Sequence, residues 1–290
     1  MNPRPWWKSL GHAGLLLVAT VYCLFPIYFM LVQSLKTAQE DVFGNPLIVM
    51  HPTFENFAEL FEREAEVRGF IGRTLRRSYP FLDWLENTLV VFAGSVGLTL
   101  IISLLAAYAL GRLRPPGFRW WRRVIFASYV IPHTILFVPL YQVVLALHLD
   151  DNLLALLLVY PTLALPFCVW ILSAYFQHLP REVEESALVE GAGRVRAFFS
   201  IILPMSWPVV VAAGIFTLGT IASDFTLASV FLLDAQNQTI PGGLGTMDVA
   251  LDELLAVAGI NLMAIPVVLI CALFARSYVR GLTAAMIEGA

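Results

Sequence analysis

The stretch ESALVEGAGRVRAFFSIILP, residues 185–204, is a polar interlude between two long apolar runs. Pro180 precedes it and suits the first turn of a helix, because its fixed φ is already helical there. Gly191 permits a left-handed turn where that helix would end. The stretch therefore predicts a short helix over about 181–190, a turn and a second short helix, which together form an elbow at 177–205.

Several side chains of this elbow suit contact with another protein. Ser186 and Ala187 are small enough for a close approach, and Glu185 can fix the angle between the two short helices by pairing with Arg194 or Arg196. A solvated connector is the plain alternative, but a linker has no need of a glycine and a Leu-Pro at these separations. The candidate docking residues are Glu182, Glu185, Ser186, Ala187, Gly191, Ile201, Leu203 and Pro204.

The rest of the chain has the composition of an integral membrane protein. Hydrophobic residues make up 59% of the 290 residues, charged residues only 13%, and the mean hydropathy is +0.77. A hydrocarbon core of about 30 Å is crossed by about 20 helical residues, and period-two alternation typical of an outer-membrane barrel is absent. We expect an all-α membrane protein with six transmembrane helices, at 14–35, 85–110, 124–147, 153–176, 207–231 and 256–275.

Basic residues predict the orientation of these helices. Arginines concentrate in the connections 112–123 and 181–196, whereas the connections 148–151 and 232–255 contain no Lys or Arg. Because cytoplasmic loops carry the excess of positive charge, both termini and the elbow are expected in the cytoplasm. The expected organisation is a cytoplasmic N-terminus (1–13), a retained first span (14–35), an extracytoplasmic segment (36–80), a core of five spans (81–280) and a cytoplasmic tail (281–290).

Polar residues within the apolar runs are candidates for a solute path. Asp224 is an acidic residue well inside an expected span, whereas Glu86 lies at the very start of another, and ionisable groups within a span are costly. His133 and Gln142 lie beside Pro132 and Pro139 in the third run. Hydrogen bonding between helices explains these residues equally well.

Three further features bear on the fold. The charged segment 36–80 predicts an amphipathic helix or two at the outer surface. Prolines are expected to interrupt the third, fourth and sixth spans, which makes spans three to six the expected moving core. Each cysteine lies inside an expected span, which disfavours a disulfide or a zinc site. These prolines and cysteines are Pro132, Pro139, Pro161, Pro166, Pro266, Cys23, Cys168 and Cys271.

The spacing Glu-Ala-Ala, three residues, Gly, nine residues, Ile, one residue, Leu-Pro resembles the signature of permease subunits of binding-protein-dependent ABC importers. Ser186 replaces the usual first alanine, a small-for-small change. The resemblance covers nearly the whole chain and is most evident for the sugar-importing branch, such as maltose importers. Other similar segments are Asn87-Thr88-Leu89, AAYALGR at 106–112, Pro166-Phe167 and RGLTA at 280–284.

The resemblance implies a type I importer permease fold in a bacterial or archaeal cytoplasmic membrane. It implies as partners a homologous second permease, a homodimeric ABC ATPase, an extracytoplasmic solute-binding protein and membrane lipid, with the elbow seated on the ATPase. The implied cargo is a sugar such as maltose, a maltodextrin or trehalose. No cofactor is expected on this chain, since ATP and Mg would bind the ATPase. Nucleic acid is not an expected partner, because the net charge is only −3.

The residues agree with this division of labour. A P-loop has Gly immediately before its Lys, but Lys8 and Lys36 follow Trp7 and Leu35. A gradient-driven secondary transporter is one alternative, although intramembrane acids and inverted repeats are scarce. An intramembrane serine protease using Ser95 and His133 is another, but the segment AGSVG at 93–97 lacks the first glycine of a nucleophile elbow. We therefore expect no catalytic residue and no metal site.

Overall fold

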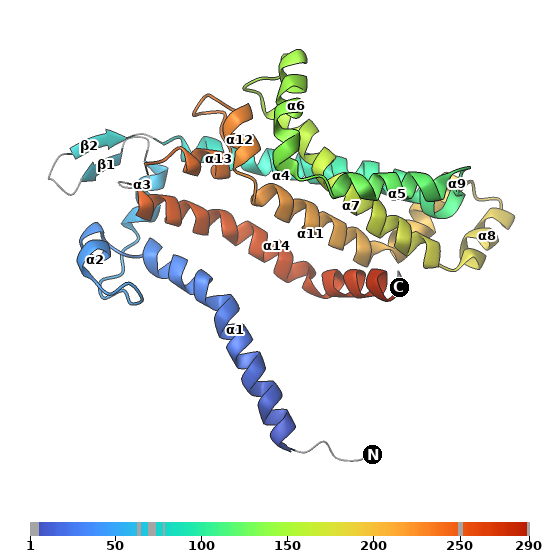
Figure 1. The fold of residues 1–290 in the computed structure, drawn as a ribbon, viewed down its shortest axis with the longest axis horizontal. Coiled ribbons are helices and arrows are strands. Elements are labelled where there is room, and N and C mark those ends of the chain that lie inside the picture. Colours follow the sequence, from blue (N-terminus) through green and yellow to red (C-terminus); the bar gives the residue numbers. More distant parts are fainter. Residues whose placement is uncertain (1–5, 63–64, 69–73, 78, 249–251, 289–290) are drawn as a thin grey trace. The chain divides into compact units, whose positions relative to one another are not determined.

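The computed structural model describes residues 6–62, 65–68, 74–77, 79–248 and 252–288. These residues form two compact units, one made of 1–81 with 247–264 and the other of 82–246 with 265–290. The helix α14 (Glu253–Glu288) contributes to both. Figure 1 labels the elements of each unit.

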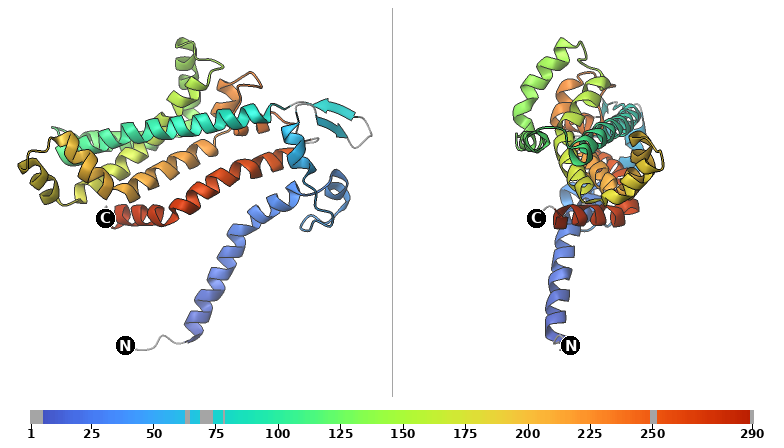
Figure 2. Two further views of the ribbon diagram at one scale, coloured as in Figure 1. Left: turned by 180° about the vertical axis from the view of Figure 1, so that it is seen from behind. Right: turned by 90° about the vertical axis from the view of Figure 1, so that its right-hand side faces the viewer.

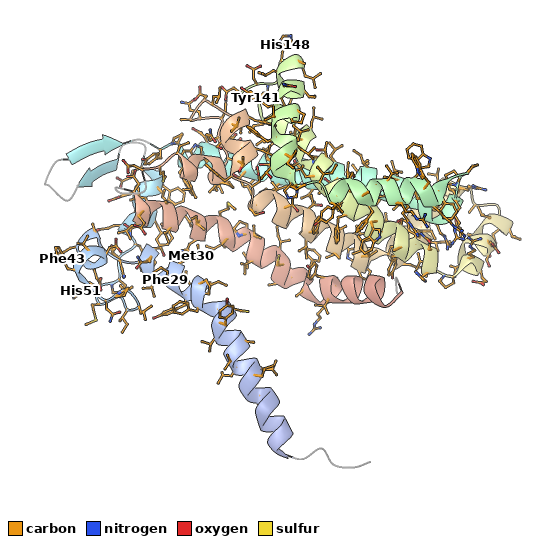
Figure 3. The ribbon with its side chains drawn as sticks, viewed as in Figure 1. Phe29, Met30, Phe43, His51, Tyr141 and His148 are labelled. Atoms are coloured by element: carbon orange, nitrogen blue, oxygen red, sulfur yellow. The ribbon has the colours of Figure 1, made fainter. Side chains whose placement is uncertain are left out.

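The first unit contains α1 (Trp6–Ser34), α2 (Ala38–Phe43), α3 (Glu55–Phe61) and the start of α14. Asn261 on α14 donates to the carbonyl of Met30 on α1 at 3.0 Å, and Figure 3 labels Met30 near the end of that helix. Asn56 on α3 donates to the carbonyls of Ser34 and Lys36. Side-chain amides therefore hold the end of α1 within this unit.

The segment 36–80 contains strands as well as helices. α2 and α3 are the short helices expected there, but β1 (Ala65–Arg68) and β2 (Thr74–Arg77) form an antiparallel pair in which Glu66 lies opposite Arg76. The expectation of helices alone is wrong for this part of the chain, and the fold is nearly all-helical. A charged segment without a continuous apolar face has little to hold it as a helix, and pairing two short strands satisfies its backbone groups instead.

The second unit is built around α7 (Leu153–His178), which contacts both α5 (Phe118–Tyr129) and α11 (Trp207–Ala222) (Figure 1). Aromatic rings fill these contacts, with 4.0 Å between the ring centroids of Phe167 and Phe216. The buried cluster at the centre of the unit consists of Ala107, Ala164, Cys168, Ile171, Leu172, Phe176, Phe198, Ile202, Val209, Val210 and Ala213. The remaining elements are α4 (Phe81–Tyr108), the π-helix η1 (Ala109–Leu113), α6 (His133–Ala146), α8 (Arg181–Val189), α9 (Arg194–Ala197), the π-helix η2 (Phe198–Ile202), α10 (Leu203–Met205), α12 (Thr226–Phe231) and α13 (Ile240–Gly245).

Four helical segments among the described residues are long and apolar enough to cross a membrane: Ala13–Ser34, Phe81–Leu113, Leu153–His178 and Glu253–Val279. Two bent pairs raise the number to six if each pair is one span. The first pair, α5 with α6, bends by 97° and turns α6 away from α5 (Figure 2). The second pair, Arg194–Met205 with Trp207–Ala222, bends by 77°. The part of the chain that the structure describes thus has four to six candidate spans.

The third and fifth spans differ from their expected form. The third is broken at Pro132, which precedes α6, while α6, α7 and α14 continue through the other four prolines. The expected interruption is therefore confirmed only at Pro132, since a proline removes one backbone hydrogen bond and the freed groups can be satisfied within the bundle without ending the helix. The expected fifth helix ends at Ala222, and α12 begins after a short break at Thr226.

The loop after α12 is tied to the start of α4. Asn87 on α4 donates to the carbonyls of Gln236 at 2.8 Å and Gln238 at 2.9 Å. The hydroxyl of Thr88 accepts from the backbone N–H of Ile240 at 2.8 Å. These bonds join residues about 150 positions apart and leave little freedom in the loop.

Candidate functional site

The elbow at 177–205 begins with α8, a nine-residue helix that follows Pro180 directly. Its first turn carries Glu182 and Glu184, whose negative charges favour the positive end of the helix dipole. Ser186 donates from its hydroxyl to the carbonyl of Glu182 at 2.7 Å, so this side chain is folded back on the helix. The expected short helix is present at 181–189.

Gly191 ends α8 with φ of +89°. The N–H of Ala192 donates to the carbonyl of Ala187 at 2.9 Å, and the N–H of Gly191 donates to that of Leu188 at 3.1 Å, so the last carbonyls of α8 are satisfied by the turn. A Cβ at Gly191 would meet nothing within 4 Å. This position therefore requires conformational freedom rather than space.

The acidic residue that holds the elbow is Glu184. One carboxylate oxygen accepts from Nε of Arg112 at 2.8 Å, and the other accepts from the hydroxyl of Tyr108 at 2.7 Å. The Arg112 and Glu184 side chains are only 3% and 13% exposed. Among the described residues Glu185 makes no ion pair with Arg194 or Arg196, so the expected lock at Glu185 is wrong. Glu185 lies exposed on α8, and Glu184 points back to η1 instead.

Arg112 also holds the end of α7. Its guanidinium donates to the carbonyls of Leu179 at 2.8 Å and Pro180 at 3.2 Å, and more weakly to that of Phe176 at 3.4 Å. These carbonyls have no partner within α7, and the positive charge also suits the negative end of the helix dipole. Arg112 is thus both a cap for α7 and the ion-pair partner of α8.

Gly111 brings η1 close enough to α7 for these contacts. A Cβ at residue 111 would lie 2.9 Å from the carbonyl oxygen of Ser173 and 3.0 Å from Cβ of Phe176. Any side chain would push η1 away from α7 and carry Arg112 with it. The glycine is explained by close packing.

Several arginine side chains lie close to the ion pair between Arg112 and Glu184. The pKa of Arg114 is lowered, mainly by desolvation and in addition by the neighbouring positive charges of Arg181 and Arg112. Arg114 donates from Nε to the carbonyl of Gly111 at 3.2 Å, which keeps its chain folded back on η1. The base of the elbow therefore presents a basic rim.

The second half of the elbow enters the core. Ala197, Phe198 and Ile202 are buried, and the Phe198 ring lies 5.0 Å from the Tyr108 ring between centroids. Val195 and Phe199 on the same elements are exposed. η2 therefore anchors the elbow on one side and presents apolar side chains on the other.

The expected docking residues fall into two groups. Glu182, Glu185, Ser186, Ala187 and Gly191 lie together on α8 and its turn, all exposed except the half-buried Ala187. The other group lies at the base of α11, with Ile201 and Leu203 half-buried and Pro204 exposed. The structure places both groups in one elbow but only the first on its free helix.

Three residues of this site were not singled out from the sequence: Tyr108, Arg112 and Glu184. The available signal was the AAYALGR segment at 106–112, which places Tyr108 and Arg112 four residues apart on one helical face. Their partner lies 72 residues or more away in the sequence, and no local pattern identifies it.

The candidate solute-path residues lie elsewhere in the second unit. Asp224 stands between α11 and α12, where one carboxylate oxygen accepts from the Tyr160 hydroxyl at 3.0 Å and from the N–H of Leu227 at 3.1 Å. His133 and Gln142 are exposed on α6. Figure 3 labels Tyr141 on the same helix, and its ring stacks on Phe231 with 5.7 Å between centroids.

The residues of the alternative protease site are not arranged for catalysis. Ser95 is completely buried within α4, and its hydroxyl has no hydrogen-bond partner among the described residues. His133 is exposed at the start of α6. A buried, unpaired serine has no base beside it to activate it.

A family model described as "Binding-protein-dependent transport system inner membrane component" matches residues 99–283. The chain is 31% identical to the inner membrane ABC transporter permease protein YcjP of Escherichia coli over 99% of both chains. It is 29% identical to the trehalose/maltose transport system permease protein MalG of Thermococcus litoralis over 95% of both. It is 28% identical to the diacetylchitobiose uptake system permease protein DasC of Streptomyces coelicolor over 92% of both.

A solved structure with the same fold is among those that match. It is a chain of a bacterial ABC transporter involved in the import of the acidic polysaccharide alginate, with a TM-score of 0.74 and 18% sequence identity. The alignment covers 95% of the present chain and 99% of the other. The type I ABC permease fold therefore extends over nearly the whole chain.

Proposed function

Since the chain belongs to the family of binding-protein-dependent transport system inner membrane components, we propose that its elbow couples sugar import to ATP hydrolysis on a partner subunit. The chain is a permease subunit of a sugar ABC importer, a multi-pass protein of the cytoplasmic membrane and not itself an enzyme. The elbow is the surface on which we place the ATPase.

The observation that carries this proposal is an elbow that is anchored on its inner side and uncovered on its outer side. Glu184 is held by a largely buried ion pair, whereas Val189, Val195 and Phe199 are 89%, 72% and 58% exposed. Exposed apolar side chains on a polar, structured segment are typical of a surface that another protein covers. Ser186, Ala187 and Gly191 beside them allow the partner to approach the backbone closely.

In this proposal the elbow, both termini and the tail at 281–290 face the cytoplasm, and 36–80 faces outward. A homodimeric ABC ATPase binds ATP and Mg, a homologous second permease supplies the other half of the pathway, and an extracytoplasmic binding protein delivers the solute. Closure of the ATPase around ATP moves α8 as a rigid body between two global states. Membrane lipid surrounds the spans.

The proposed cargo is maltose, a maltodextrin or trehalose. Support comes from the printed names of relatives, which include a trehalose/maltose permease and a diacetylchitobiose permease. We place His133, Gln142 and Asp224 along the solute path. Uptake assays with radiolabelled maltose, maltotriose and trehalose test this, because His133→Ala or Gln142→Ala should raise KM for the transported sugar while ATP hydrolysis is retained. An unchanged KM in both variants would remove them from the path.

The elbow is tested by two matched glycine variants. Gly191 has φ of +89° and Gly193 has φ of −71°, and neither would meet a neighbour through an added Cβ. Alanine at 191 is strained by about 1–2 kcal/mol, whereas alanine at 193 is not. We expect Gly191→Ala to lower uptake and recovery of the ATPase in a pull-down, while Gly193→Ala leaves both near wild type.

The same pull-down from native membranes identifies the partners. Recovery of a second permease and an ATP-hydrolysing subunit with the tagged chain supports the proposal. A chain that purifies alone in mild detergent, or a Gly191→Ala variant with normal uptake, contradicts the elbow as the coupling surface.

A further inference from the structure

We propose that Arg112 is the positioning residue that fixes α4, α7 and α8 to one another, so that the three helices move together as a rigid lever. A displacement of α8 is then transmitted to both α4 and α7. Arg112 lies in η1, outside the elbow and outside the expected docking set. The inference rests on the proposed function, because it assumes that a partner moves α8. It names the residue through which that movement enters the bundle.

The first argument is that Arg112 is bonded both to α8 and to the two residues that connect α7 to α8. Nε donates to Glu184 of α8, one terminal nitrogen donates to the carbonyl of Leu179, and the other to that of Pro180. Guanidinium is planar, so its donors hold these acceptors at fixed angles to one another. A lysine would supply the charge but not this geometry.

The second argument is that the connector between α7 and α8 is short and fixed. Only Leu179 and Pro180 separate the end of α7 from the start of α8, and Arg112 holds the carbonyls of both. Proline also fixes its own φ. Since the connector cannot swing independently, movement of α8 must displace the end of α7.

The third argument is that α4 and its continuation η1 bind α8 through two side chains. Tyr108 and Arg112 lie one helical turn apart and bind the two oxygens of the same Glu184 carboxylate at 2.7 and 2.8 Å. Two bonds to one carboxylate resist rotation of α8 as well as translation. Arg112 lies in the π-helical turn η1, and such turns are frequent at functional sites.

The fourth argument is burial. With the two side chains of the ion pair 3% and 13% exposed, water and salt compete little for it. Removing either partner leaves the other as a buried charge without its partner, which is strongly destabilising. Partial separation of Arg112 from Glu184 is therefore disfavoured. The ion pair is therefore suited to transmitting a displacement of α8 without itself coming apart.

The test uses the complete importer in proteoliposomes and measures sugar transported per ATP hydrolysed. We expect Arg112→Gln and Glu184→Gln to lower this ratio by at least about fivefold, the lower end of typical coupling between sites. Arg112→Lys should fall between Arg112→Gln and wild type. Arg123→Gln is the matched control, because Arg123 is exposed on α5 and makes no hydrogen bond or ion pair among the described residues.

The outcomes separate this inference from the proposed function. A wild-type ratio in Arg112→Gln and Glu184→Gln, with Gly191→Ala still uncoupled, overturns the lever and leaves the elbow in place. A wild-type ratio in all three overturns the proposed function as well. If Arg112→Gln fails to assemble, Tyr108→Phe decides: it removes one bond and keeps the ion pair, so a lowered ratio supports the lever and an unchanged ratio overturns it.

Discussion

Gly243 lies so close to the indole of Trp84 that a Cβ at residue 243 would overlap the six-membered ring. Trp84 is 1% exposed and donates from Nε1 to the carbonyl of Ala235 at 2.6 Å. The indole is thus enclosed by α13 and the loop before it. This contact closes the loop onto the first turns of α4.

Gly243→Ala should destabilise the protein by about 1–3 kcal/mol, the usual cost of overpacking a filled site. The reason is that neither the indole nor the backbone of α13 can yield. Thermal unfolding in detergent measures the effect. Gly219→Ala is the control, because a Cβ there meets nothing within 4 Å and alanine is the better helix former within α11, by up to about 1 kcal/mol. Equal melting temperatures for both variants would contradict the packing argument.

Asp151→Ala should destabilise the loop after α12. One carboxylate oxygen of Asp151 accepts from the N–H groups of Leu233 at 2.8 Å and Asp234 at 2.9 Å, and hydrogen bonds to charged groups contribute about 1.5–3 kcal/mol each. Limited proteolysis of the 232–239 segment and the melting temperature both report the change. Asp150→Ala, at the exposed neighbouring position, should behave as wild type. Equal cleavage of the two variants would show that the cap is unimportant.

Gly111→Ala should separate η1 from α7. The new Cβ would lie 2.9 Å from a backbone oxygen, which cannot move without disturbing α7. We expect a lower melting temperature and, because Arg112 is the next residue, a lower transport-to-ATP ratio. Gly97→Ala, within α4 and facing open space, is the control. A normal ratio in Gly111→Ala would mean that the ion pair tolerates a shift of η1.

Asp224→Ala should lower the melting temperature more than Asp224→Asn. The carboxylate accepts from Tyr160 and from the N–H of Leu227, and an asparagine oxygen retains both acceptor roles whereas alanine retains neither. Tyr160→Phe, which removes one of the two donors, should lie between them. This structural task is separate from any contact with solute, which the KM for uptake reports. Equal melting temperatures for Ala and Asn would argue against it.

Local chemistry predicted much of the elbow. Pro180, the acidic first turn and Gly191 specify the start, charge and end of α8 through interactions within a few residues, and the helix lies at 181–189. The break at Pro132 follows from the same kind of reasoning. The strand pair at 65–77 was missed, because its backbone pairing depends on two segments meeting rather than on the pattern of either one.

The sequence by itself determined that the chain is a helical membrane protein with an interposed elbow, because hydropathy and turn chemistry are properties of neighbouring residues. Only the tertiary structure decided which acidic residue holds that elbow. Glu184 and Glu185 are adjacent and chemically identical, and they differ only in the direction that one residue of helix, about 100° of rotation, gives each side chain. That rotation aims Glu184 at Tyr108 and Arg112 and leaves Glu185 exposed, and it becomes meaningful only once η1 has packed against α7.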